Sequence, residues 1–344
     1  MSSPPPVTTS TGAMPERSPS TTFRDPHAPC AVVLGGTGCI GRHISAAFAR
    51  HGYRVVVVAR KPAPHSADAA FQPMDLLTAS AGTIGRMLRD VRASVVVNAT
   101  DMAGATDLTG SADGGEARAA ELLHANEGLA RKLIAAMERQ PGRPRLVHIG
   151  TIHEYGSATA GAPLDESVPT EPRNAYARAK LAGSQAVLDA ARADTVEGVV
   201  LRLVNTCGPY PTPAGFPGKL LSRLRAIGQG DEPALTVADA MRDWVDVRDV
   251  AEAVVRAAER PVSGHVFNIG SGVAVPMREL VSHCLTAAGL PRAAVSERES
   301  PVRSLGADWI QADIRLAKEL LGWSPRIGLK ESLQDMWDAG ATSR

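Results

Sequence analysis

The sequence predicts an α/β protein built on a doubly wound parallel sheet, with a smaller C-terminal substrate-binding domain. Short strands that are apolar throughout occur at "AVVLGG" (31–36) and "YRVVVVAR" (53–60), and an amphipathic helical stretch, "RHISAAFARHG" (42–52), lies between them. Fully apolar strands are typical of a sheet buried on both faces, and regular alternation with helices is typical of parallel pairing.

The following elements continue this alternation. Further strands are expected at 93–100, 145–150 and 197–205, with helices at 116–139 and 174–193 between them. After residue 206 the Pro/Gly-rich "CGPYPTPAGFPG" predicts a loop. The second half then contains a predicted helix near 219–227, a short strand at 234–237 and a strand and turn at 264–272.

These patterns divide the chain into three parts. Residues 1–28 are rich in Pro, Ser and Thr and have too little apolar surface to offset the entropy of ordering, so a disordered tail is expected. Residues 29–206 form the main α/β domain, to which segments at about 242–270 return. Residues 207–340 form mainly the substrate-binding domain.

Composition excludes several classes of partner. The 344 residues include 44% hydrophobic and 21% charged residues, and the net charge is +1. This charge gives no reason to expect nucleic acid or an anionic membrane as partner, and no apolar run approaches the roughly 18 residues of a membrane helix. The four cysteines lie far apart without a CxxC pair or nearby His, which predicts free thiols in a reducing cytoplasm and no metal site.

A glycine-rich turn joins the first strand to the first helix. In "LGGTGCIGRH" the glycines follow a GxxGxxG spacing. Glycines let the backbone approach a pyrophosphate, which the helix N-terminus stabilises through its N–H groups and dipole. Glycine turns are common, but the flanking strands and helix predict a dinucleotide site and hence a Rossmann domain. Its candidate residues are Gly35, Thr37, Gly38, Cys39, Ile40 and Gly41.

The end of the second strand indicates which dinucleotide binds. An enzyme that uses NAD usually has Asp or Glu here, accepting hydrogen bonds from the adenosine ribose. This slot is Ala59, followed by Arg60 and Lys61. Two cations without a carboxylate favour the 2′-phosphate of NADP(H), because an Arg fork pairs well with phosphate oxygens. The alternative is a solvated basic loop.

Two later strand ends add candidate cofactor contacts. Asp75 and Leu76 could lie against the adenine, and Asn98, Ala99 and Thr100 would lie beside the nicotinamide ribose. In such sheets, ligands bind at the carboxyl ends of the strands.

Tyr176 and Lys180 are four residues apart on the helix predicted at 174–193, so both project from one face. A free tyrosine, with a pKa of about 10, is a poor acid–base catalyst near neutrality. A lysine ammonium one turn away, together with an oxidised nicotinamide ring, would favour the phenolate. Such i,i+4 pairs are also common on helix surfaces.

At this point the chain resembles the extended short-chain dehydrogenase/reductases, the NAD(P)-dependent epimerases, dehydratases and reductases of nucleotide sugars. The resemblance runs from about Ala31 to about Trp337. It rests on "GGTGCIG", "GTIHEYG", "NAYARAK", "LRLVNTCGP", "RDWVDVRDVAEA", "FNIGSG" and "ADIRLAKELLGWSPRIGL". It implies catalysis by Thr151, Tyr176 and Lys180, in which Thr151 orients a substrate oxygen and Lys180 holds the nicotinamide ribose and lowers the tyrosine pKa.

The resemblance also implies substrate contacts and a subunit arrangement. Asn205 is expected to contact the sugar or its diphosphate, and Arg242 and Arg303 to clamp the diphosphate. His153 would touch the sugar or simply pack, while Glu154 is expected to be structural and Tyr155 to fix the turn or line the pocket. A homodimer is typical of the family.

The stretch "GTIHEYG" indicates which reaction is catalysed. Dehydratases of the family have Asp-Glu after the catalytic Thr, whereas these slots hold Ile152 and His153, so dehydration is not expected. Use of NADP favours net reduction, because cells keep this cofactor largely in its reduced form. The "HEYG" motif resembles that of the 4-ketoreductases of nucleotide-linked 6-deoxyhexoses. We therefore expect a cytoplasmic NADPH-dependent reductase of a dTDP-4-keto-6-deoxyhexose, in deoxysugar biosynthesis for bacterial secondary metabolites such as antibiotics. The alternatives are a nucleotide-sugar 4-epimerase and a non-catalytic NADP-binding regulator.

Overall fold

The computed structural model describes residues 27–63, 69–101, 115–156, 158–213, 215–229, 234–235, 237–292, 296–297 and 308–341. All but the last two residues of the expected disordered tail, 1–28, therefore lie outside the described part, as does Arg303. In the described residues, no helix is both long enough and apolar enough to cross a membrane.

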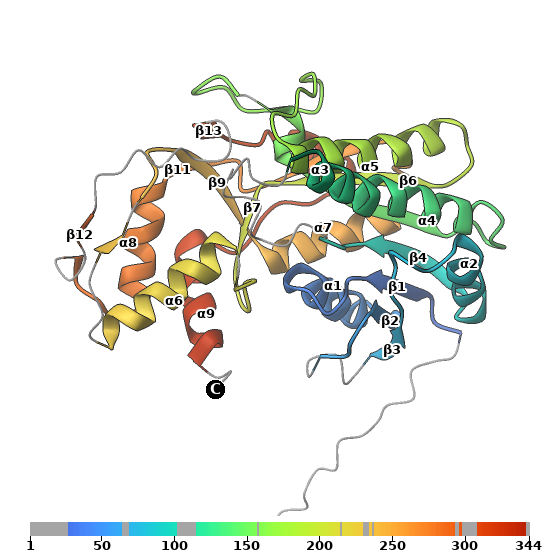
Figure 1. Ribbon diagram of the computed structural model, residues 1–344, viewed down its shortest axis with the longest axis horizontal. Coiled ribbons are helices and arrows are strands. Elements are labelled where there is room, and N and C mark those ends of the chain that lie inside the picture. The colour runs from blue at the N-terminus through green and yellow to red at the C-terminus, as the bar shows by residue number, and fades with distance from the viewer. Residues whose placement is uncertain are drawn as a thin grey trace, which may run out of the picture.

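Helices and strands alternate from Cys30 onward (Figure 1). The main sheet and its helices are made by β1 (Cys30–Leu34), α1 (Cys39–Arg50), β2 (Arg54–Ala59), β3 (Ala70–Pro73), α2 (Ala81–Asp90), β4 (Ala93–Asn98), α3 (Gly115–Leu123), the π-helical turn η4 (His124–Gly128), α4 (Leu129–Met137), β5 (Arg145–Thr151), the 3-10 turn η5 (Ile152–Tyr155), α5 (Ala175–Arg192), β6 (Gly198–Leu203), α7 (Val247–Glu259) and β10 (Val266–Ile269).

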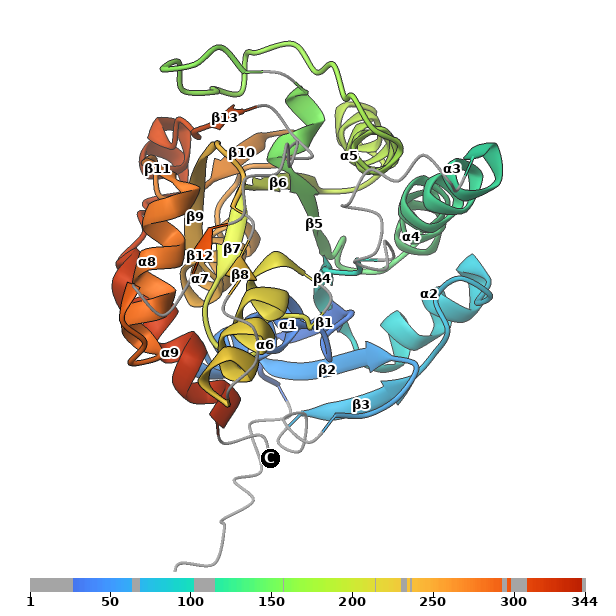
Figure 2. The same ribbon diagram turned by 60° about the vertical axis from the view of Figure 1, so that its left-hand side comes forward.

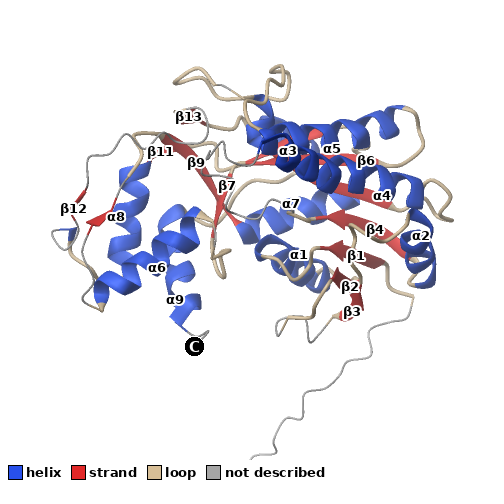
Figure 3. Cartoon of the chain, in the orientation of Figure 1, coloured by secondary structure: helices blue, strands red, loops and turns tan. Residues whose placement is uncertain are grey.

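The main sheet has seven strands in the order β10-β6-β5-β4-β1-β2-β3, and every neighbouring pair is parallel. Helices cover both faces of this sheet (Figure 3). The strand order reverses between β1 and β4, which is where open parallel sheets bind ligands, beyond the carboxyl ends of the strands. The predicted doubly wound Rossmann fold is confirmed.

The apolar strands form two hydrophobic layers because successive side chains point to opposite faces. In β1, Ala31 and Val33 pack with α1 and α7, whereas Val32 and Leu34 pack with α2, α4 and α5. All five residues of β1 are fully buried. A strand buried on both faces needs apolar residues at every position, which is why the sequence shows no alternation here.

The C-terminal part adds a smaller sheet and three helices, which lie together beside the main sheet (Figure 2). In this sheet β7, β11 and β13 each pair with β9. Helices α6, α8 and α9 share a separate apolar cluster with Trp244. Two returning segments contribute to the main domain: β10 pairs with β6, and α7 packs against α1. The division into a cofactor domain and a substrate domain remains an interpretation.

The elements of this part are β7 (Asn205–Cys207), α6 (Phe216–Gly228), β8 (Ala234–Leu235), β9 (Met241–Asp246), β11 (Ala274–Pro276), α8 (Met277–Ala287), β12 (Ser296–Glu297), β13 (Trp309–Ile310), the π-helical turn η7 (Ala317–Leu321) and α9 (Leu329–Ala341).

Candidate active site

The glycine-rich turn after β1 has the geometry that a bound diphosphate requires. Gly35 has a positive φ of 76°, and a Cβ on Gly41 would lie 2.2 Å from the carbonyl oxygen of Gly35. Gly38 caps α1 without a side-chain hydrogen bond, so no capping side chain competes with an anion for the first N–H groups of the helix. Thr37, Cys39 and Ile40 lie in this turn and in the first turn of α1. The cradle fits a nicotinamide dinucleotide.

The two predicted cations for the 2′-phosphate follow β2 directly. Arg60 and Lys61 are exposed, and neither makes an ion pair or hydrogen bond with another described residue. After β3, Leu76 is buried and Asp75 is exposed, with its Oδ1 accepting a hydrogen bond from the N–H of Leu77 at 3.0 Å. The Asp75 carboxylate thus already stabilises its own turn, and its contact with adenine remains a prediction.

The turn after β4 packs directly on the glycine-rich turn. The Asn98 side chain is buried, and its Oδ1 accepts hydrogen bonds from the Thr100 hydroxyl at 2.7 Å and the Thr100 N–H at 3.4 Å. A Cβ on Gly35 would lie 2.9 Å from the carbonyl oxygen of Ala99 and 3.1 Å from the Cα of Thr100. Asn98, Ala99 and Thr100 therefore lie beside the glycine-rich turn at the reversal point of the sheet.

Thr151 is the last residue of β5 and the N-cap of η5. Its Oγ1 accepts a hydrogen bond from the N–H of His153 at 3.4 Å, and Glu154 accepts one from the N–H of Thr151 at 3.0 Å. This capping box fixes the chain direction at the strand end. Thr151 is consequently held at the carboxyl edge of the sheet, where the sequence predicted it.

Glu154 belongs to a buried ion pair behind this turn. Its fully buried carboxylate accepts hydrogen bonds from Arg202 Nε at 2.8 Å and Ser184 Oγ at 2.9 Å, besides the N–H of Thr151. The ring centre of Tyr155 lies 4.4 Å from the guanidinium carbon of Arg202, and Tyr155 is 1% exposed. Glu154 is therefore structural, as expected, and Tyr155 fixes the turn instead of lining a pocket.

Helix α5 carries Tyr176 and Lys180 to the end of β5. The Lys180 ammonium is buried and donates a hydrogen bond to the carbonyl oxygen of Ile149 at 2.5 Å. Asn174 caps the helix by accepting the N–H of Ala177 at 2.8 Å, which fixes where α5 begins. Tyr176, in the first turn, lies one helical turn from Lys180 on the same face.

The charge environment of Tyr176 differs from the sequence-based expectation. Burial raises the pKa of Tyr176 well above its ordinary value, and the negative charges of Asp101 and Glu154 raise it further. Burial also lowers the pKa of Lys180, against the opposing effect of the same two carboxylates. The lowering of the tyrosine pKa by Lys180 together with the oxidised nicotinamide remains a prediction for the cofactor-bound protein. The phenol is held in its protonated form.

Asp101 was missed by the sequence analysis. Burial is the largest influence on the pKa of Tyr176, Lys180 and Cys39, and the negative charge of Asp101 raises the pKa of each. The exposed carboxylate of Asp101 therefore lies near all three side chains. Its position three residues beyond the end of β4 was the available signal, because neighbouring parallel strands end at one edge. Asp101 thus adds a negative charge between α5 and the glycine-rich turn.

The predicted substrate residues occupy η5 and the smaller sheet. Burial, and then the positive charge of Arg242, lower the pKa of His153 to about 4, so the two side chains lie near each other. Arg242 on β9 is 5% exposed. Asn205 on β7 donates to the carbonyl oxygen of Asp243 at 3.3 Å, which holds it beside β9. The structure therefore brings His153 and Arg242 together, with Asn205 on the adjacent strand.

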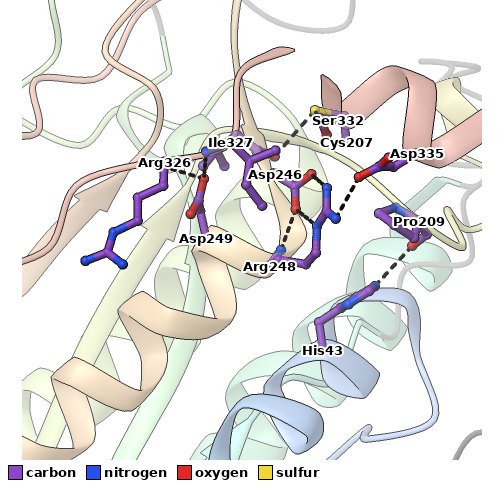
Figure 4. A network of polar contacts seen from close by, with 11 residues as sticks. His43, Cys207, Pro209, Asp246, Arg248, Asp249, Arg326, Ile327, Ser332 and Asp335 are labelled. Carbon is purple, nitrogen blue, oxygen red and sulfur yellow. Dashed lines mark hydrogen bonds and ion pairs between the residues drawn. The ribbon is translucent and has the colours of Figure 1, made fainter. Parts of the chain in front are cut away.

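A polar network joins α1 to the C-terminal part (Figure 4). The Nε2 of His43 on α1 lies 3.1 Å from the carbonyl oxygen of Pro209, which follows β7. Asp246 caps α7 and accepts hydrogen bonds from Arg248 Nε at 2.9 Å and Nη2 at 2.8 Å, and Arg248 also reaches Asp335 on α9 at 2.7 Å. These contacts fix the smaller sheet relative to the helix that starts at the glycine-rich turn.

The fold and the glycine-rich turn fit a protein that binds a nicotinamide dinucleotide, and sequence comparison defines its family. Residues 31–270 match the family described as "NAD dependent epimerase/dehydratase family". The chain belongs to this family, and the protein is an NAD(P)-dependent enzyme that modifies nucleotide sugars.

Two characterised relatives align with nearly the whole chain. Over 324 residues the chain is 35% identical to the dTDP-6-deoxy-L-talose 4-dehydrogenase (NAD(P)(+)) of Kitasatospora kifunensis, covering 92% of this chain and 98% of the relative. It is 26% identical to a UDP-glucose 4-epimerase of Corynebacterium glutamicum, covering 89% of this chain and 94% of that protein.

Two solved structures share the fold. A UDP-glucose 4-epimerase of Thermus thermophilus in complex with NAD superposes with a TM-score of 0.78 at 23% identity, covering 92% of this chain and all of that one. RMD of Pseudomonas aeruginosa, complexed with NADPH, gives a TM-score of 0.76 at 21% identity, covering 92% of this chain and 99% of that one.

Proposed function

We propose that the protein uses NADPH to reduce the 4-keto group of a dTDP-linked 4-keto-6-deoxyhexose. The observation that carries this proposal is the 35% identity, over nearly the whole of both chains, to a dTDP-6-deoxy-L-talose 4-dehydrogenase. Dehydrogenation at C4 and reduction of the 4-keto group are the two directions of one reaction. A reductase therefore has the same site requirements as that relative.

The end of β5 supports redox chemistry at one carbon and argues against dehydration. Ile152 has no proton to transfer, and the carboxylate of Glu154 is buried and occupied by Arg202, Ser184 and the N–H of Thr151. A dehydratase needs a free acid and base beside the catalytic Thr. The carboxylate closest in sequence to those positions is committed to the fold.

The proposed mechanism divides the work among three side chains. When bound, the reduced nicotinamide supplies the hydride that adds to C4 of the sugar. Tyr176 donates its phenolic proton to the carbonyl oxygen, and Thr151 orients this oxygen by hydrogen bonding. Lys180 then stabilises the phenolate until it takes a proton from solvent. A ketone reduction starts from the protonated phenol and ends with the phenolate, whose negative charge the nearby Lys180 ammonium would favour.

The remaining assignments complete the proposed site. Arg60 and Lys61 bind the 2′-phosphate, while His153, Asn205 and Arg242 contact the nucleotide sugar. A guanidinium pairs bidentately with phosphate oxygens, which suits Arg242 to the diphosphate. Arg303 is proposed for the same diphosphate from its sequence position alone. The homodimer remains a prediction.

The test of function is turnover with defined substrates. Incubation with NADPH and a panel of dTDP-4-keto-6-deoxyhexoses should consume NADPH in a one-to-one ratio with a dTDP-6-deoxyhexose product. Interconversion of C4 epimers without net NADPH oxidation would instead identify a 4-epimerase. Tight NADP binding with no turnover on any keto sugar would favour the regulator.

The cofactor preference has its own test. Arg60→Ala should weaken NADPH binding by about tenfold, roughly 1.4 kcal/mol for a lost charge-assisted contact, and leave NADH binding nearly unchanged. Arg89→Ala, which removes an exposed arginine from α2, is the matched control. Fluorescence titration with both cofactors gives the dissociation constants. Equal losses for NADPH and NADH would overturn the NADP assignment.

A further inference from the structure

His148 is a buried histidine on β5 that the proposed mechanism does not use. Its side chain is 1% exposed and lies on the face of β5 that packs against α5. A Cβ on Gly183 of α5 would lie 3.3 Å from the Nε2 of His148. The other ring nitrogen, Nδ1, lies 3.1 Å from the Nδ2 of Asn98 at the end of β4.

The hydrogen bonds around Asn98 determine the tautomer of His148. Asn98 Oδ1 accepts the backbone N–H of Thr100, and an N–H can only donate, so the amide nitrogen of Asn98 must face His148. An amide nitrogen is also a donor, which makes His148 Nδ1 the acceptor and puts the ring proton on Nε2. In the described part of the structure, the buried Nε2 has no hydrogen-bond partner.

The surroundings keep this imidazole neutral. Burial, and then the positive charge of Lys180, lower the pKa of His148 to about 3. A protonated ring would present a second donor to the Asn98 amide and break the contact. An unpaired buried donor at Nε2 is costly, and an apolar residue would avoid that cost. The contribution of the imidazole at this position is therefore its Nδ1 acceptor.

That acceptor begins a chain of contacts that reaches the cofactor cradle. Nδ1 of His148 fixes the Asn98 amide, whose oxygen holds both the N–H and the hydroxyl of Thr100. The turn formed by Ala99 and Thr100 packs so closely on Gly35 that a Cβ at this glycine would lie 2.9 Å from the Ala99 carbonyl oxygen. Rotation of the Asn98 amide would break the two hydrogen bonds that hold this turn beside Gly35.

We propose that His148 is a positioning residue, a neutral Nε2–H imidazole that sets the Asn98–Thr100 turn against the glycine-rich turn and so shapes the cofactor site. This inference rests on the proposed dinucleotide site and deepens it, since His148 touches neither cofactor nor substrate.

The test compares His148→Leu, which removes the acceptor, with His148→Asn, whose side-chain oxygen can replace Nδ1. Affinity is measured by fluorescence titration with whichever of NADPH and NADH the wild type binds more tightly. His148→Leu should weaken binding by about tenfold, the effect of leaving one buried amide donor unpaired, and His148→Asn should restore most of it. Leu146→Ala, on the same face of β5 two residues earlier, controls for loss of core packing.

A second readout does not depend on binding. Nitrogen NMR of the full-length wild type should show His148 with an unprotonated Nδ1 and a protonated Nε2 throughout the neutral range. The inference is overturned if His148→Leu binds the cofactor like the wild type, if Leu146→Ala weakens binding equally, or if Nδ1 carries the proton. Failure of sugar reduction with the expected affinity changes would instead reject only the proposed reaction.

Discussion

Replacing Glu154 with Gln should strongly destabilise the protein. The Glu154 carboxylate is fully buried and faces Arg202, which is 5% exposed, at 2.8 Å. Glutamine keeps the shape and one acceptor oxygen, but it removes the negative charge and directs an N–H₂ donor at a guanidinium donor. Removing one partner of a buried ion pair leaves an uncompensated charge and costs about 3–5 kcal/mol. We expect a loss of this size in the free energy of unfolding.

Urea unfolding without cofactor, followed by circular dichroism, measures this loss directly. Asp189→Asn is the matched control, because Asp189 pairs with Arg192 on the surface of α5, where both side chains are more than half exposed. An exposed pair contributes about 0–1 kcal/mol, so the control should unfold nearly like the wild type. A loss below about 1 kcal/mol for Glu154→Gln would refute the assignment of Glu154 to the fold.

Three further predictions test the site. Tyr176→Phe should lower kcat by at least about 10²-fold while NADPH affinity stays within a few-fold, and full activity would remove Tyr176 from the mechanism. Gly41→Ala should abolish measurable cofactor binding, since its Cβ would lie 2.2 Å from the Gly35 oxygen; wild-type titration curves would contradict this. His148 and His153 stay neutral down to a pKa of about 3 and about 4. In the unfolded chain the two rings protonate near pH ~6.5, so their contribution to the free energy of unfolding is fully present above that pH. As the pH falls from ~6.5 to about 4, the free energy of unfolding should decrease by about 1.4 kcal/mol per pH unit for each histidine, and urea midpoints that stay constant over this range would contradict the prediction.

The sequence was sufficient for the sheet and the cofactor cradle because both depend on local pattern. Uniformly apolar strands that alternate with helices indicate a sheet covered by helices on both faces, and the GxxGxxG spacing places glycines at positions 35 and 41, where the turn leaves no room for a Cβ. The electrostatics of Tyr176 could not be obtained in this way. Asp101 lies 75 residues earlier in the chain and comes near Tyr176 only through the order of the strands in the sheet. The effect of a charge from a distant part of the chain depends on the topology of the sheet, which a local motif does not reveal.

The carboxylate of Glu154, at the end of β5, has its hydrogen-bonding positions occupied by the fold itself. A Cβ on Gly150 would lie 2.6 Å from Glu154 Oε1 and 3.1 Å from Ser184 Oγ, so the carboxylate occupies the space that any larger residue at position 150 would need. The inward carboxylate therefore requires the glycine before Thr151. Because Arg202, Ser184 and the N–H of Thr151 occupy its oxygens, the Glu154 carboxylate is not available to a substrate. Among the described residues of η5, none offers the Thr151 hydroxyl a free carboxylate, which is why we propose carbonyl reduction and not the elimination of water.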